Sequence, residues 1–194
     1  MNPFIPTAQD LLHNRGLLIA GKIYEFAEIE FYFYSPTHLD IYAHCHPEQK
    51  VYGKFYFHRA SNREGVGYKG GTYKGLDITL GDGKDTYYGI LIRALYNPEV
   101  GIITGPSKVV DHILSQYKVG SINELVGNGC LDLLNNHRDM KMVELKVKNT
   151  EKIYVGPRIG LNMNTSQEWV QKPYRFCIHY PLIKKDKRKL VCIN

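Results

Sequence analysis

Apolar and polar positions alternate over much of the chain, and this alternation predicts strands more often than helices. The longest such stretch, KIYEFAEIEFYFY, is rich in Tyr, Phe and Ile, which favour a pleated, half-buried surface. Asp82 and Gly83 form a turn signal between two further apolar stretches, so we expect a hairpin there. The strands and the hairpin expected from this pattern lie at 16–21, 22–34, 54–58, 76–96, 152–161 and 172–183.

Helical spacing of apolar residues is rarer. Proline marks the start of helices expected over 6–14 and 105–117, and a third, interrupted by two glycines, is expected over 123–134. Strands dominate, and the helices cluster in the middle of the chain. The predicted fold is therefore α+β: a single domain over residues 1–194, with a curved antiparallel β-sheet core and a few flanking helices.

The net charge of the chain limits the classes of binding partner that we expect. The 194 residues carry a formal net charge of +6 with a pI near 9.0, which favours a polyanion or an anionic membrane surface over a basic substrate. The basic excess is concentrated in KKDKRK at 184–189. We expect a solvated tail there, with a nuclear-import signal or a phosphate contact as the alternatives.

The cysteines and the apolar runs indicate an intracellular protein. The four cysteines show neither a CxxC pair nor the spacing of a disulfide framework, so free thiols in a reducing compartment are expected. No apolar stretch approaches the ~18 residues of a membrane span. The N-terminus lacks a basic region followed by an apolar core, so no signal peptide is expected.

Two glutamates interrupt the aromatic strand at 22–34. Glu28 and Glu30 are two residues apart, so their side chains should point to the same face. A carboxylate walled by aromatic rings loses solvation, and its pKa rises into the range of a useful general acid or base. The alternative is that one of the two faces solvent or pairs with a lysine.

Half of the histidines lie within one short region. His44 and His46 would share a face if the backbone were extended, which resembles a metal chelate. Because no spacing supplies the third and fourth ligands, we expect no metal. A metal-dependent hydrolase built on these two histidines stays as an alternative. The other members of the group are His38 and His58.

A stretch rich in Gly, Lys and Arg at 59–75 is expected to form an exposed, mobile loop. Its glycines do not have the spacing of a P-loop. A cationic loop that carries Tyr68 and Tyr73 suits a nucleic-acid backbone with an aromatic wedge nearby. A surface insertion without this function is equally compatible with the pattern.

Four stretches, in this order, resemble the alkyladenine (3-methyladenine) DNA glycosylase family. They are AEIEFYFYSP at 27–36, DIYAH at 40–44, ILIRALYNPEVG followed by GPSKVV at 90–110, and PRIGL followed by EWVQKPYRF at 157–176. The resemblance covers most of the chain, and its last motif is the most specific. It implies a single α+β domain that flips a damaged purine out of duplex DNA and excises it.

The resemblance also implies roles for individual residues. Glu30 would be the general base that activates a water for attack on the sugar C1′. Tyr32 and His44 would flank the flipped base, Tyr56 would form a pocket wall, and Arg93 would lie near the flipped nucleotide.

Two pocket positions depart from the family pattern: His58 replaces a tyrosine and Asp77 replaces an asparagine. The family's intercalating tyrosine has no clear counterpart because the loop is longer here, and Tyr68 and Tyr73 are the candidates.

We therefore expect a monofunctional purine DNA glycosylase, without a lyase step or a cofactor, acting as a monomer on double-stranded DNA in the nucleus or nucleoid. A non-catalytic nucleic-acid-binding module on the same scaffold is the main alternative. The substrate-binding residues would be Tyr32, His44, Tyr56, His58, Asp77 and Arg93. The DNA-binding residues would be Tyr68, Tyr73, Lys69, Arg158 and Lys172.

Overall fold

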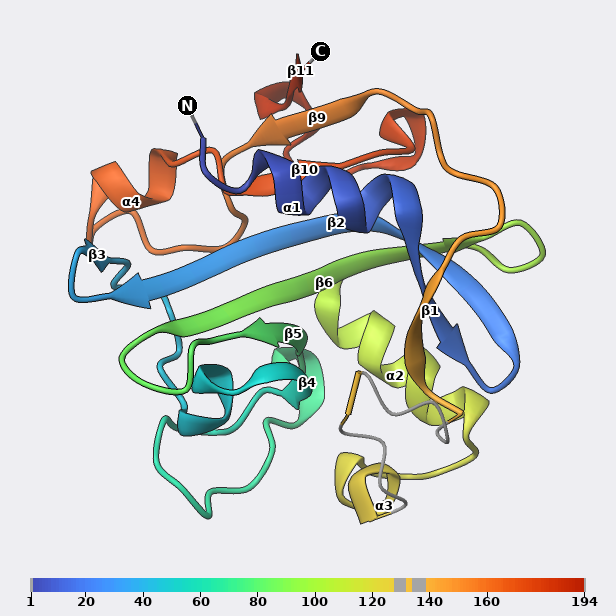
Figure 1. Ribbon diagram of the computed structural model, residues 1–194, viewed down its shortest axis with the longest axis horizontal. Helices are drawn as coiled ribbons and strands as arrows, with labels where there is room; N and C mark the ends of the chain where they lie inside the picture. The colour runs from blue at the N-terminus through green and yellow to red at the C-terminus, as the bar shows by residue number, and fades with distance from the viewer. Residues whose placement is uncertain (1, 128–131, 134–138, 194) are drawn as a thin grey trace.

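The computed structural model of this protein describes residues 2–127, 132–133 and 139–193. A curved antiparallel sheet forms its centre, where the long strands β2 (Lys22–Ser35) and β6 (Tyr87–Asn97) pair with each other (Figure 1). The other strands are β1 (Arg15–Ile19), β3 (His38–Leu39), β4 (Tyr52–Phe57), β5 (Leu76–Leu80), β7 (Gly101–Thr104), β8 (Lys141–Glu144), β9 (Ile153–Gly156), β10 (Arg175–Cys177) and β11 (Val191–Ile193). Within the described residues, the strand order in the sheet is β11-β9-β10-β2-β6-β5-β4. In addition, β1 and β3 pair with β2, β7 pairs with β6, and β8 pairs with β1.

An irregularity divides both central strands into two halves. In the β2–β6 register, Ala27 on one strand and Arg93 on the other have no Cα partner. Because successive side chains point to opposite faces, each extra residue changes which positions face the core. On β2, the buried core positions are even-numbered before the irregularity and odd-numbered after it: Tyr24 and Phe26, then Ile29 and Phe31.

Short helices flank this sheet. The helix α1 (Ile5–Gln9) continues into a π-helical turn over Asp10–Asn14, and α2 (Pro106–Gln116) packs against β6 and β7. The other two are α3 (Ile122–Gly127) and α4 (Gln167–Gln171). Apolar side chains of α1, the π-helical turn and α2 join the main hydrophobic cluster with those of the sheet. None of the described helices is long and apolar enough to cross a membrane.

The α+β class and the curved antiparallel sheet expected from the sequence are confirmed, as are the helices at 6–14 and 105–117. Of the helix expected at 123–134, residues 123–127 are helical in α3. The expectation is wrong at 132–133, because Asp132 forms an isolated β-bridge with Lys54 and Leu133 lies in a turn. Positions 128–131 and 134 lie outside the described residues. The elements β3, β7, β8, β11 and α4 were not predicted from the sequence, because they are too short to show a period.

The basic run at 184–189 is largely solvated, as expected, but it is not a free tail, and that part of the expectation is wrong. A 3-10 turn over Lys187–Lys189 leads into β11, which pairs with β9. The backbone oxygen of Lys185 also accepts a hydrogen bond from the buried Arg175 guanidinium, at 2.8 Å. Backbone pairing therefore places this segment on the sheet, although most of its charged side chains are exposed.

Candidate functional site

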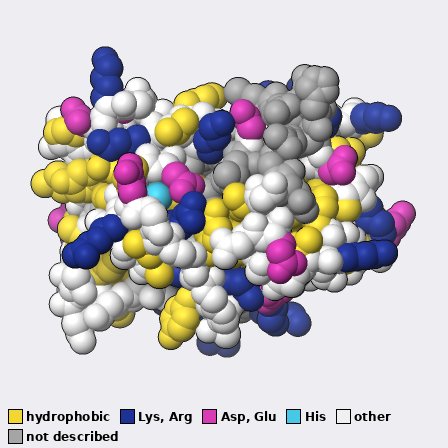
Figure 2. Space-filling view, turned by 90° about the horizontal axis from the view of Figure 1, so that it is seen from below, with side chains coloured by type: hydrophobic (Ala, Val, Ile, Leu, Met, Phe, Trp, Pro, Cys, Tyr) yellow, Lys and Arg dark blue, Asp and Glu magenta, His cyan; other side chains and the backbone are white. Residues whose placement is uncertain are grey.

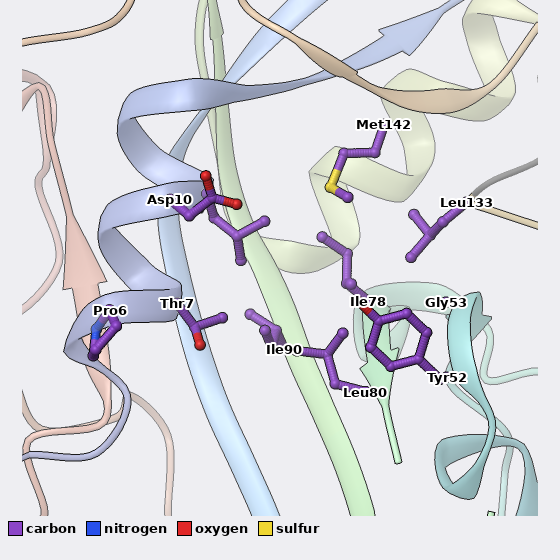
Figure 3. A pocket seen from close by; sticks show the side chains of 11 residues that line it. Pro6, Thr7, Asp10, Tyr52, Gly53, Ile78, Leu80, Ile90, Leu133 and Met142 are labelled. Atoms are coloured by element: carbon purple, nitrogen blue, oxygen red, sulfur yellow. The ribbon is translucent and has the colours of Figure 1, made fainter. Parts of the chain in front are cut away.

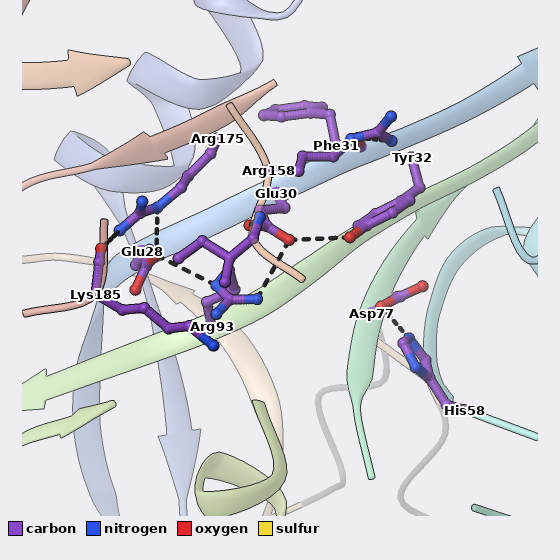
Figure 4. A network of polar contacts seen from close by, with 11 residues as sticks. Glu28, Glu30, Phe31, Tyr32, His58, Asp77, Arg93, Arg158, Arg175 and Lys185 are labelled. Carbon is purple, nitrogen blue, oxygen red and sulfur yellow. Dashed lines mark hydrogen bonds and ion pairs between the residues drawn. The ribbon is translucent and has the colours of Figure 1, made fainter. Parts of the chain in front are cut away.

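The two glutamates of β2 lie on one face, as expected, but that face is dry. The side chains of Glu28 and Glu30 are 6% and 0% exposed. Arg93 binds both, with Nε 3.2 Å from Glu28 Oε1 and Nη1 3.3 Å from Glu30 Oε2 (Figure 4). Arg175 Nε donates to the same Glu28 oxygen at 2.5 Å. The alternative expectation, in which one glutamate faces solvent or pairs with lysine, is wrong because buried arginines neutralise both.

Glu30 has further hydrogen bonds on both carboxylate oxygens. The Tyr32 hydroxyl donates to Oε2 at 3.0 Å, and the backbone N–H of Ile159 donates to Oε1 at 2.7 Å. Burial raises the pKa of Glu30 above its usual range, although the Arg93 charge and the Ile159 N–H act in the opposite direction. The site thus holds a poorly solvated carboxylate that is a stronger base than a surface glutamate.

Arg93 owes its position to the irregularity in β6. It is the residue without a Cα partner, and its guanidinium bridges the two glutamates. Burial alone would lower the pKa of Arg93, but the charges of Glu30 and Glu28 raise it above its ordinary value. Arg93 is not among the residues that line the adjacent pocket. The structure therefore places it behind the carboxylates rather than against a flipped nucleotide.

A pocket of about 190 Å³ lies next to this charged group, on the other side of Tyr32. Tyr32 lines the pocket while its hydroxyl binds Glu30, so it joins the buried base to the cavity. The pocket is lined by Tyr32, Tyr42, His44, Gln49, His58, Lys69, Asp77 and Leu161.

His58 and Asp77 form a hydrogen-bonded pair in the pocket wall. His58 Nε2 lies 2.7 Å from Asp77 Oδ1, and Gln49 Nε2 donates to Asp77 Oδ2 at 2.9 Å (Figure 4 shows the His58–Asp77 contact). Two glycines make room for this arrangement. A Cβ on Gly75 would lie 2.6 Å from His58 Nδ1, and one on Gly89 would lie 2.4 Å from Asp77 Oδ2. Asp77 is consequently a partnered carboxylate rather than a bare negative charge.

His44 and Tyr56 lie at different depths. His44 lines the pocket, its Nε2 is 3.1 Å from the backbone oxygen of Ser61, and burial lowers its pKa, which favours the neutral ring. Tyr56 is fully buried behind the histidines, with its ring centroid 6.1 Å from that of His44 and 5.8 Å from that of His58. The expectation that Tyr56 forms the pocket wall is wrong, because it supports the histidines that form that wall.

Arg158 is a support of the site and not a DNA contact, so that expectation is also wrong. Its side chain is fully buried, and it makes two hydrogen bonds to Asp40, at 2.5 and 3.0 Å. Its guanidinium carbon lies 4.5 Å from the centroid of the Tyr32 ring. This contact helps to hold Tyr32 with its hydroxyl on Glu30.

The remaining candidates for DNA binding differ in exposure. Tyr73 is 78% exposed, whereas Tyr68 packs against the core and stacks on Arg59, with the guanidinium carbon 3.8 Å from its ring centroid. Lys69 lines the pocket. Lys172 forms an ion pair with Glu168 at 2.9 Å. Of the two tyrosines, only Tyr73 is available for a wedge role in this conformation.

Figure 2 shows how charged side chains are distributed on one face of the molecule. On the face seen in Figure 2, Lys and Arg side chains are interspersed with Asp and Glu and do not form one continuous patch. On this face, a backbone polyanion would therefore meet separate basic side chains rather than one continuous patch.

Several members of this site were not predicted from the sequence. Gln49 shows no local pattern that marks it, whereas Ile159 and Leu161 lie in the quoted PRIGL motif, which did not indicate that one would bind Glu30 and the other would line the pocket. Asp40 and Tyr42 both lie in the quoted DIYAH motif, and its tyrosine was the available signal for the pocket wall.

The described residues contain no group of three or more His, Cys, Asp or Glu placed to hold a metal ion. His46 is buried, and its Nδ1 accepts the backbone N–H of Glu48 at 3.2 Å. In this part of the chain, His44 and His46 thus lack the further ligands that a metal centre requires.

A separate cavity of about 380 Å³ lies between α1 and the β4–β5 end of the sheet (Figure 3). Its walls are mostly apolar, with Thr7 and Asp10 supplying the polar side chains that Figure 3 labels. Neither Glu30 nor the histidines reach it. Volume alone would favour this cavity, but the chemistry-bearing side chains lie around the smaller pocket.

Comparison with known proteins gives a relative. No family model matches the chain. The chain is similar to "Uncharacterized protein L759" of Acanthamoeba polyphaga mimivirus, with 43% identity over 199 aligned positions that cover 95% of this chain and 90% of the viral protein. This identity extends over nearly the whole of both proteins, so the chain belongs to the same protein family as the mimivirus protein.

Proposed function

We propose that this protein is a monofunctional DNA glycosylase that hydrolyses the N-glycosidic bond of a flipped, alkylated or deaminated purine. The observation that carries the proposal is that one residue contacts both a buried carboxylate and a ring-lined pocket: Tyr32 lines the pocket, and its hydroxyl binds Glu30. A base must leave the helical stack to be reached, and aromatic walls compensate for the lost stacking. The resemblance of four stretches to alkyladenine DNA glycosylases supports the same activity.

Glu30 acts as the base through Tyr32. As the bond between C1′ and the purine nitrogen breaks, a water oxygen forms the new bond to C1′. The water gives a proton to the Tyr32 oxygen, and Tyr32 passes its own hydroxyl proton to Glu30 Oε2. Burial and the Glu30 charge raise the pKa of Tyr32 well above its ordinary value. Tyr32 therefore relays a proton and does not ionise by itself.

Double-stranded DNA is the proposed partner, and the nucleus or nucleoid is the proposed location. The net charge of +6 supports binding to a phosphate backbone. Exposed Tyr73 is the proposed wedge, and Lys69 at the pocket is a proposed phosphate contact.

The test is base release from duplex oligonucleotides that contain 3-methyladenine or hypoxanthine, under single-turnover conditions. Glu30→Gln and Tyr32→Phe should each reduce release by about 10²- to 10⁴-fold, the usual size of general acid–base effects. Because the pKa of Glu30 is raised, wild-type activity should increase with pH over a range above the ordinary glutamate value. Glu99→Gln, on an exposed side chain, is the matched control. Full excision by Glu30→Gln would falsify the mechanism.

The second candidate is a non-catalytic nucleic-acid-binding module on this scaffold. The observation that favours this function is the complete burial of Glu30, whose side chain is 0% exposed and accepts hydrogen bonds on both carboxylate oxygens. A salt titration of DNA binding beside the excision assay discriminates between the two functions. Binding with a steep salt dependence and no release of either base would support the module.

A further inference from the structure

The basic run at 184–189 is a charged surface that the proposed hydrolysis does not use. Its six residues include five basic side chains and one aspartate, so it carries +4 of the net charge of +6. Two of the five are engaged within the protein: Lys189 pairs with Asp186 at 3.3 Å, and Lys187 Nζ lies 4.3 Å from the centroid of the Tyr180 ring. In the described part of the chain, the other three basic side chains are exposed and have no ion-pair partner. They are Lys184, Lys185 and Arg188.

The backbone of this segment is held at both ends. The Lys185 oxygen accepts a hydrogen bond from Arg175 Nη2 at 2.8 Å, and Arg175 Nε in turn donates to Glu28 at 2.5 Å (Figure 4). The following 3-10 turn leads into β11, which pairs with β9. Because the backbone is already ordered, a ligand that binds these charges loses less free energy to ordering than it would on a free tail.

The segment meets β2 on the face that carries the proposed site. Beyond the irregularity, the core positions of β2 are odd-numbered, so Glu28, Glu30 and Tyr32 point to the opposite face. Arg175 connects the segment to Glu28, whereas Tyr32 lines the pocket. These two positions are four residues apart on an extended strand, which is about 14 Å. Figure 4 shows Lys185 at the opposite end of this network from the pocket residues.

We propose that Lys184, Lys185 and Arg188 bind the phosphate backbone of duplex DNA to one side of the nucleotide in the pocket. This inference rests on the proposed glycosylase function and names the surface that holds the flanking duplex. Phosphates repeat about every 3.4 Å along a strand, so a separation of about 14 Å corresponds to roughly four nucleotides. Three unpaired charges along one exposed segment match such a row of phosphates better than they match a single small anion.

The salt dependence of DNA binding tests these contacts. Each phosphate contact contributes about 0.9 to the slope of log K against log salt concentration. Lys185→Gln combined with Arg188→Gln should therefore make the slope shallower by about 2, measured by fluorescence anisotropy with an undamaged, labelled duplex. The matched control is Lys22→Gln combined with Lys118→Gln, which removes the same charge from exposed lysines at the start of β2 and just after α2. The control should leave the slope nearly unchanged.

The position of the lesion tests the geometry. With hypoxanthine at the centre of a duplex, the variant of Lys185 and Arg188 should need more protein for half-maximal single-turnover release. The maximal rate should be unchanged, because neither side chain lines the pocket. When the duplex ends about two base pairs from the lesion on the side of the segment, the phosphates four nucleotides away are absent, and variant and wild type should behave alike. Truncation on the other side should preserve the difference.

A shallower slope for the segment variant, but not for the control, supports the proposal. An unchanged slope or an equal loss in the control would overturn it, as would weaker binding to phosphatidylserine vesicles with DNA binding unchanged. If both truncated duplexes preserved the difference between variant and wild type, the proposed position beside the pocket would be wrong. If the wild-type protein bound the undamaged duplex but released no base, the glycosylase function would fail, and the slope would still decide whether this segment binds DNA.

Discussion

At the residue scale, buried charge near Glu30 is compensated pair by pair. Burying an isolated carboxylate is costly, whereas a paired and hydrogen-bonded one is tolerated. Three buried acids therefore pair with three buried arginines around β2. Arg93 binds both Glu28 and Glu30, Arg175 also binds Glu28, and Arg158 binds Asp40. Glu30 differs from the other two acids because it also accepts a hydrogen bond from the hydroxyl group of Tyr32, which lines the pocket.

Gly89 offers a test at this scale. An added methyl group would lie 2.4 Å from Asp77 Oδ2 and 2.6 Å from Gln49 Nε2. Gly89→Ala should destabilise the fold by about 1–3 kcal/mol, as overpacking does, and displace the Asp77–Gln49 hydrogen bond. Urea unfolding measures this cost. Gly67→Ala, at an exposed site with no atom within 4 Å of the new Cβ, should be close to neutral. Equal stability of the two variants would argue against close packing at Gly89.

At the element scale, the segment 157–161 connects the end of β9 to the site. The Arg158 guanidinium binds Asp40, and the next backbone N–H binds Glu30. Arg158→Met would leave Asp40 as a buried, unpaired charge, which typically costs 3–5 kcal/mol. Arg158→Met combined with Asp40→Leu should recover part of that stability, because neither charge then remains.

The free energy of unfolding in urea checks this prediction. The exposed Lys22–Glu99 pair is the control, and Lys22→Met should change stability by less than about 1 kcal/mol. An Arg158→Met protein as stable as the wild type would contradict the predicted cost of leaving the Asp40 carboxylate without its arginine.

At the scale of the whole molecule, His179 joins segments that are far apart in the chain. Its Nε2 lies 2.9 Å from Glu25 on β2, and its Nδ1 lies 2.6 Å from Glu151. With a carboxylate on each ring nitrogen, the charged imidazolium satisfies both contacts. Burial lowers the pKa of His179, but Glu25 and Glu151 together raise it above its ordinary value. The hydrogen bond from His179 lowers the pKa of Glu25.

These shifts predict the pH dependence of stability. The His179 contribution is complete below its unfolded pKa of about 6.5 and is lost as pH rises through the higher folded value. His179→Gln should therefore destabilise the protein most under mildly acidic conditions, and the difference from the wild type should shrink at alkaline pH. Thermal unfolding of both proteins across this range measures the effect. A difference that grows with pH would contradict the assignment.

The local pattern of apolar and polar residues was sufficient to predict part of the fold. The alternation along 22–34 predicted β2, the spacing of two residues placed Glu28 and Glu30 on one face, and proline with helical spacing predicted α2. These features depend on interactions between neighbours in sequence, so the sequence alone contains the required information.

Tertiary structure decided the contacts of the site. Glu30 receives an N–H from a residue 129 positions away, Arg158 reaches Asp40 across 118 positions, and Arg93 turns toward the glutamates because of a register change between two strands. The sequence determined that this protein has a paired-carboxylate strand in an α+β sheet. Only the folded chain decided that the carboxylates are dry, that arginines neutralise them and that Tyr32 joins one of them to a pocket. The physical reason is that burial and long-range pairing depend on loop paths and strand register, which no local period records.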